Sequence, residues 1–137
     1  MRQHLVLRVV TKALIPPILL FALYVQFHGD FGPGGGFQAG VIFGAAFILY
    51  AIVFDVETAQ RVVPMRALTV VACLGVLLFA GVGIANIFYS GNSLEYGVLS
   101  HDPTHGNHIG IIIIEIGVGL AVAAVMMIIF FSFAGRR

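Results

Sequence analysis

The sequence predicts an all-α integral membrane protein with four transmembrane helices, and three observations support this prediction. Of the 137 residues, 60% are apolar and only 9% are charged. A soluble domain carries about 25% charged residues, so this chain cannot cover a water-facing surface. Its apolar residues form continuous runs rather than an alternating pattern, which favours helices over a β-barrel. A net charge of +1 and a single cysteine, Cys73, exclude a nucleic-acid-binding face and an internal disulfide framework.

Four stretches reach the roughly 20 mostly apolar residues that a membrane helix needs. They are residues 7–27, 35–54, 67–89 and 109–133. The connections between them are short and leave no room for a soluble domain. We therefore expect one membrane domain over residues 1–137.

The first span begins with Arg8 and Lys12 and contains Pro16 and Pro17 in its middle. A basic start before an apolar stretch is also typical of a cleaved signal peptide, but no small-x-small cleavage site follows. Each proline removes a backbone hydrogen-bond donor. We therefore expect a membrane helix that is kinked at the prolines, or a short interfacial turn that ends there.

The basic residues predict the orientation of the four spans. In a four-span topology all seven fall on one side of the membrane: Arg2, Arg8, Lys12, Arg61, Arg66, Arg136 and Arg137. Because basic residues accumulate on the cytoplasmic side, we expect both termini to be cytoplasmic.

Glu115 is an ionisable residue inside the fourth span. It stands about six residues, or roughly 9 Å, from the outer end of that span. A charged group at the centre of a membrane helix costs about 2.5–3.5 kcal/mol, so Glu115 is expected to face protein or water. Gly119 and Ala123 follow it on the same helix face, which predicts a packed face. Two interpretations stay open: a carboxylate on an ion or proton route, or a hydrogen-bonded group that locks helix packing.

Other polar residues are expected at a similar depth. Gln26 and His28 end the first span, Gln38 begins the second, and Asn86 is near the outer end of the third. Together with Glu115, the residues His28, Asn86 and Gln38 are candidates for an ion path. The inner halves of the spans are almost purely apolar, so the pattern predicts a pocket that opens only to the outside. The alternative is that these polar side chains simply lie at the membrane interface.

Small residues predict close helix contacts. Gly36, Gly40 and Gly44 form a stripe on the second span, and Gly117 with Ala121 forms a shorter one on the fourth. Such stripes let two backbones approach closely, either within this chain or with a partner.

The third connection carries three histidines and an aspartate: His101, His105, His108 and Asp102. Zinc binding would use such residues. However, Pro103 and Gly106 are expected to break any helix that would align His101 with His105. We therefore expect a polar turn that leads into the fourth span, without a metal or another cofactor.

The most specific string of the sequence runs from His28 to Gly40 and contains Pro33, Gly34, Gly35, Gly36 and Phe37. Proline followed by three glycines is typical of a hinge with unusual backbone angles. A phosphate-binding loop would need Lys and Ser or Thr after the glycines, and neither follows here.

This string resembles the signature of the B subunit of Mrp-type multi-subunit sodium/proton antiporters, the MnhB family. Members typically show a histidine, then Pro-Gly-Gly-Gly-Phe, then small residues that open a membrane helix. The matching residues here are His28, Pro33, Gly34, Gly35, Gly36, Phe37 and Gly40. Four residues separate His28 from Pro33, more than in many members. The length, the four spans and a carboxylate in the last span agree with the family as well.

The resemblance implies a non-catalytic subunit, not an enzyme, in a bacterial or archaeal cell membrane. Its partners would be large subunits similar to the proton-pumping subunits of respiratory complex I, small membrane subunits and membrane lipids. It would support assembly and could line an ion path. Alternatives are a pure assembly protein and the equivalent subunit of a membrane-bound hydrogenase or respiratory complex. A further alternative is a self-contained homodimeric transporter, although such transporters carry their carboxylate in the first helix.

Overall fold

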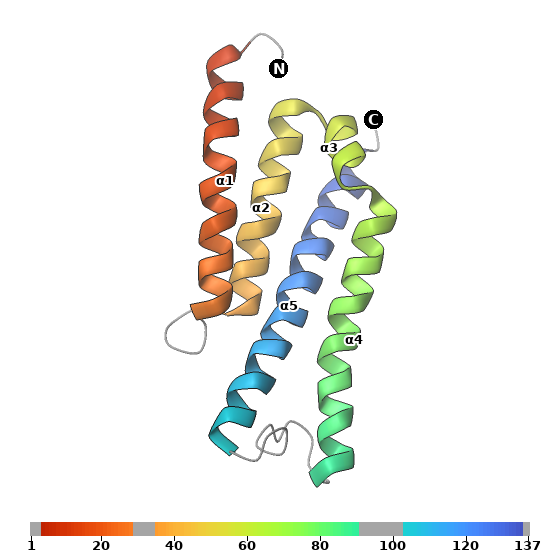
Figure 1. Ribbon diagram of the computed structural model, residues 1–137. Coiled ribbons are helices and arrows are strands. Elements are labelled where there is room, and N and C mark those ends of the chain that lie inside the picture. The colour runs from red at the N-terminus through yellow and green to blue at the C-terminus, as the bar shows by residue number, and fades with distance from the viewer. Residues whose placement is uncertain (1–3, 29–34, 91–102, 136–137) are drawn as a thin grey trace.

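A computed structural model describes residues 4–28, 35–90 and 103–135, with side chains given for these residues except 89–90 and 103–108 (Figure 1). In the described part the chain forms five helices and no strand: α1 (Leu5–His28), α2 (Gly36–Phe54), α3 (Val56–Val62), α4 (Met65–Ser90) and α5 (Pro103–Ala134). Helices α1, α2, α4 and α5 contain four segments that are long and apolar enough to cross a membrane. The predicted all-α, four-span fold is therefore confirmed.

The four long helices stand side by side in the order α1, α2, α5, α4 (Figure 1). Helix α2 packs against both α1 and α5, and α4 packs against α5. Within the spans, 33% of the α2 residues and 28% of the α5 residues are buried, against 11% in α1 and in α4. The fold is therefore a row with two central helices and two flanking helices whose apolar surfaces stay largely uncovered.

One end of the row collects the basic residues of the described chain. The start of α1, the end of α2, α3, the start of α4 and the end of α5 all lie there (Figure 1). These elements carry Arg8, Lys12, Arg61 and Arg66. We call this end the basic end. These four residues thus lie at one end of the row, as the four-span topology predicts, while Arg2, Arg136 and Arg137 lie outside the described residues.

Helix α1 continues through Pro16 and Pro17 without a break, so the expectation of a short turn that ends there is wrong. Each proline removes one backbone donor from the helix. Prolines are tolerated in membrane helices, where neighbouring groups and small adjustments of the helix satisfy the freed carbonyl groups.

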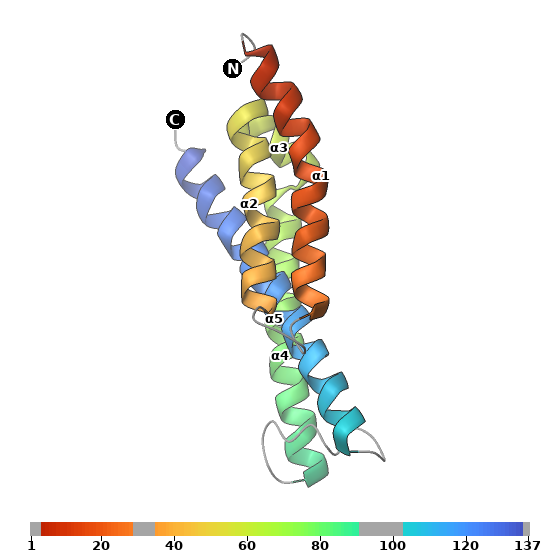
Figure 2. The ribbon, with the colours of Figure 1, turned by 90° about the vertical axis from the view of Figure 1, so that its left-hand side faces the viewer.

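Helix α5 begins at Pro103, before the expected start of the span at residue 109. Gly106 lies inside this helix, so the expectation that it would break a helix is wrong, whereas Pro103 marks the start of the helix and His101 lies outside the described residues. Proline suits the first position of a helix because its missing N–H would have no partner there. As a result, α4 and α5 extend past the ends of α1 and α2 on the side opposite the basic end (Figures 1 and 2).

The buried core lies where α2, α3, α4 and α5 meet. It contains alanines from α2, α3 and α5 and larger side chains from α4 and α5: Ala51, Ala59, Leu68, Ala123, Ala124, Met127 and Phe131. Short α3 contributes Ala59, which is 3% exposed. The core thus fixes α5 against α2 and α4, and it sets the register of the contacts described next.

Candidate functional site

The glycine stripe of α2 packs against α5 of the same chain. A Cβ atom built on Gly40 would lie 2.6 Å from the carbonyl oxygen of Gly119, and one on Gly44 would lie 3.4 Å from that of Ala123. A Cβ atom on Gly36 would overlap the backbone carbonyl of Glu115. We call this contact the α2–α5 seam. It is closest at Gly36 and opens toward the basic end.

Helix α5 also packs closely against α4, on a different face and again through glycine residues. A Cβ atom on Gly75 would lie 2.5 Å from the carbonyl oxygen of Gly117 and 2.8 Å from the backbone nitrogen of Ala121. Small residues on two faces of α5 therefore pack against two different helices. Glu115 and Gly119 face α2, while Gly117 and Ala121 face α4.

The Glu115 carboxylate lies at the beginning of α2. Its Oε1 atom is 3.2 Å from the position of a Cβ atom on Gly35, the residue that precedes the helix. The first N–H groups of a helix lack intrahelical partners and carry partial positive charge. Gly35 has no side chain to cap them, so a carboxylate from α5 occupies the place beside them. A side chain at position 35 or 36 would displace Glu115.

Gln26 of α1 joins this group. Its Oε1 atom lies 2.5 Å from the position of a Cβ atom on Gly119, which also faces the carbonyl oxygen of Gly36 at 3.2 Å. The Nε2 atom of Gln26 is buried and has no hydrogen-bond partner among the described residues. Gln26 and Glu115, with the glycines between them, form what we call the polar cluster.

An apolar cavity of about 430 Å³ adjoins the polar cluster between α1, α2, α4 and α5. Gln26, Gly40 and Gly119 border it on the cluster side. Among the described residues that line it, Gln26 is the only polar side chain. The described residues that line this cavity therefore do not form a polar route that leads away from the polar cluster.

The other predicted ion-path residues, His28, Gln38 and Asn86, lie on α1, α2 and α4. His28 is exposed, and its ring stacks on Tyr24 with 5.1 Å between the centroids. Gln38 is exposed, and so is Phe37 at 64%. Asn86 is fully buried, but it stands eleven residues beyond Gly75, or about 16 Å along α4. It therefore lies beyond the contact of Gly75 with α5, toward the end of α4 that is opposite the basic end.

Several predicted residues fall outside the described part. Pro33 and Gly34 do so, as do His101, Asp102 and the side chains of His105 and His108. Among the side chains that the structure does describe, no group of three His, Cys, Asp or Glu residues gathers in one place.

From the sequence, Gln26 is expected at a depth similar to that of Glu115, but it is not among the ion-path candidates. The rotation of α1 about its axis decides whether Gln26 or His28 faces α5. That rotation is set by packing against α2, which no local signal in α1 records. The sequence signal that could have identified Gln26 is a polar residue that would lie opposite a glycine stripe.

Comparison with known proteins agrees with the resemblance in the motif. Residues 6–128 match a family described as a domain related to the MnhB subunit of Na⁺/H⁺ antiporter. A proposed antiporter subunit mnhB2 of Staphylococcus haemolyticus is 36% identical over 98% of this chain and 97% of its own length. A chain of the same name from Staphylococcus aureus strain Newman is 33% identical with the same coverage. The chain belongs to the family of MnhB-related antiporter subunits.

Proposed function

We propose that this chain is a non-catalytic membrane subunit of a multi-subunit sodium/proton antiporter. The observation that carries the proposal is the family match over residues 6–128, which includes all four spans almost completely. The family description favours this setting over a hydrogenase-type complex and over a self-contained homodimeric transporter.

The open row of helices supports a role inside a larger assembly. The flanking helices expose large apolar side chains, such as Leu77 at 65% and Phe88 at 85% on α4. Lipid or other subunits would cover these surfaces in the membrane. The partners that suit such a subunit are larger membrane subunits of the antiporter, and both termini would face the cytoplasm.

Within the subunit, the α2–α5 seam acts as the structural scaffold. It holds Glu115 beside the start of α2 and places Gln26 against Gly119. This arrangement favours a role for Glu115 in an ion path over a purely structural one, because a half-buried carboxylate and a buried amide donor share one cluster. Partner subunits would complete the path, since the adjoining cavity is apolar.

The test is deletion and complementation in the native host. Removing the chain should abolish sodium-driven proton exchange in inverted membrane vesicles, and expression of the intact chain should restore it. A chain that carries Gly36→Leu, which cannot form the seam, should fail to restore exchange. Normal exchange in vesicles from the deletion strain would contradict the proposed function.

A further inference from the structure

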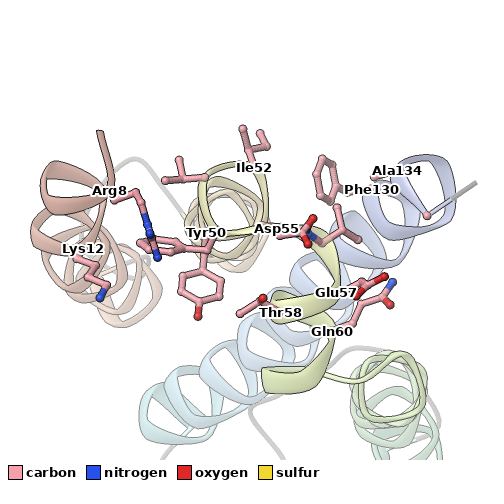
Figure 3. A pocket seen from close by; sticks show the side chains of 15 residues that line it. Arg8, Lys12, Tyr50, Ile52, Asp55, Glu57, Thr58, Gln60, Phe130 and Ala134 are labelled. Atoms are coloured by element: carbon pink, nitrogen blue, oxygen red, sulfur yellow. Dashed lines mark hydrogen bonds between the residues drawn. The ribbon is translucent and has the colours of Figure 1, made fainter. Parts of the chain in front are cut away.

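A large cleft opens at the basic end of the row, far from the polar cluster. Its volume is about 960 Å³, and it lies between α1, the end of α2, α3 and the end of α5. Figure 3 shows Arg8 and Lys12 on the α1 side, Tyr50 beside them, and Glu57 with Gln60 on the opposite side. Its volume is at the upper end of the range for small-molecule sites.

Two cations form one wall of the cleft. Arg8 and Lys12 are one helical turn apart, so their side chains share a face of α1. The Cζ atom of Arg8 lies 5.1 Å from the centroid of the Phe54 ring, and the Nζ atom of Lys12 lies 5.5 Å from it. Within the described chain, neither forms an ion pair with a carboxylate. The aromatic ring thus orients both charges toward the cleft without neutralising them.

The depth of the cleft matches that of lipid headgroups. Phe54 is the last residue of the α2 span, so the cations stand where the apolar span ends. Apolar side chains of Ile52 and Phe130 also line the cleft. A ligand with a phosphate at the interface and hydrocarbon below it would contact both kinds of surface. Basic pockets between membrane helices bind the phosphate-bearing headgroups of lipids such as cardiolipin.

The opposite wall restricts the charge of the ligand. Asp55 and Glu57 both line the cleft across from Arg8 and Lys12. These carboxylates would repel a headgroup with negative charge alone and would attract an ammonium group beyond the phosphate. We propose that the cleft binds a zwitterionic phospholipid, with its phosphate at Arg8 and Lys12 and its amine toward the acidic wall.

The experiment measures lipid binding to the full chain in detergent by native mass spectrometry. The probes are phosphatidylethanolamine, phosphatidylglycerol with the same acyl chains, and inorganic phosphate. We expect one phosphatidylethanolamine per chain at this site, bound more tightly than phosphatidylglycerol. Arg8→Gln combined with Lys12→Gln should weaken that binding about tenfold or more, as expected for lost charge-assisted hydrogen bonds.

The matched control is Arg61→Gln combined with Arg66→Gln, which removes the same charge from residues that do not line the cleft. It should bind lipid like the unmodified chain. Because Lys12 is exposed, Lys12→Gln alone still tests the proposal if the double variant fails to fold. Equal losses in both double variants, tighter binding of phosphatidylglycerol, or displacement of the lipid by inorganic phosphate would overturn it.

Discussion

Glu115 contacts the start of α2 through two different groups, its backbone carbonyl and its side-chain carboxylate. Its backbone carbonyl packs directly on Gly36, and its carboxylate lies beside Gly35 at the start of α2. The first contact depends on the absence of a side chain at position 36 and would survive any substitution of Glu115. The second depends on the carboxylate itself. The two roles can therefore be separated by mutation.

Exchange of Glu115 for glutamine tests the role of its charge. Glu115→Gln keeps the size of the side chain and its hydrogen-bonding capacity, so we expect normal assembly of the complex. If the carboxylate belongs to an ion path, sodium-driven proton exchange in inverted vesicles should fall, or its pH profile should move. Glu115→Leu serves as the comparison that also removes hydrogen bonding. An unchanged profile for Glu115→Gln would leave Glu115 with a packing role only.

Gly36 should tolerate no side chain at all. A Cβ atom there meets the backbone of Glu115, which cannot move aside like a flexible side chain. We expect Gly36→Ala to lower the free energy of unfolding by about 1–3 kcal/mol, the usual cost of overpacking. Gly81→Ala is the matched control, since nothing lies within 4 Å of a Cβ atom at that position. Thermal unfolding in detergent compares the two, and equal stability would show that the seam is looser than described.

The sequence predicts the chemistry of this region better than its geometry. The spacing of Gly36, Gly40 and Gly44 was enough to predict a close helix contact, because small residues four apart lie on one helix face. The same pattern did not identify α5 as the partner. Nor did it predict how far α4 and α5 extend past α2.

At the scale of elements, the junction between α2 and α3 depends on Asp55. Its backbone φ angle of 102° lies in a region that glycine adopts far more easily than other residues. Its Oδ1 atom accepts a hydrogen bond from the backbone N–H of Val56 at 2.9 Å, which begins α3. The hydrogen bond compensates for part of the backbone strain and turns the chain from one helix into the next.

Substitutions at Asp55 should therefore rank in an unusual order. Asp55→Ala loses the cap and keeps the strain, so we expect it to cost about 1 kcal/mol or more. Asp55→Gly also loses the cap but relieves the strain, so it should be milder. Urea or thermal unfolding of both variants would show the order. If alanine proves the milder replacement, the described backbone at this junction is wrong.

The boundaries of α5 show where local signals mislead. Pro103 and Gly106 suggest a turn when they are considered one at a time. In the structure, Pro103 takes the first helical position and Gly106 lies inside the helix. The long apolar segment that follows carries the helix past a single glycine, whose cost is about 1 kcal/mol. Helix existence was thus predictable here, whereas the start of the helix was not.

At the scale of the whole molecule, the basic end predicts the orientation in the membrane. Its described basic residues stand on three separate helices, α1, α3 and α4, yet they lie at one end of the row. Reporter fusions at Gln60 and at the C-terminus should therefore indicate the cytoplasm, while a fusion at Asn92 should indicate the opposite side. Reports of the same side from Asn92 and the C-terminus would contradict four spans.

The open row also explains why the fold was more predictable than the site. Four apolar segments predict the number of spans, and the one-sided charges predict their orientation, from the sequence alone. The order α1, α2, α5, α4 depends on which glycine faces which helix. In addition, much of the surface of α1 and α4 has no neighbour in this chain. The structure of one subunit thus leaves those faces for the assembly to cover.

The most direct test of the central claim is affinity purification of the tagged chain from its native membrane. If the chain is an antiporter subunit, it should co-purify with several larger hydrophobic proteins. Gly40→Leu, which forces α2 away from Gly119, should strongly reduce their recovery. Purification of the unmodified chain alone, as a monomer or homodimer, would contradict the claim.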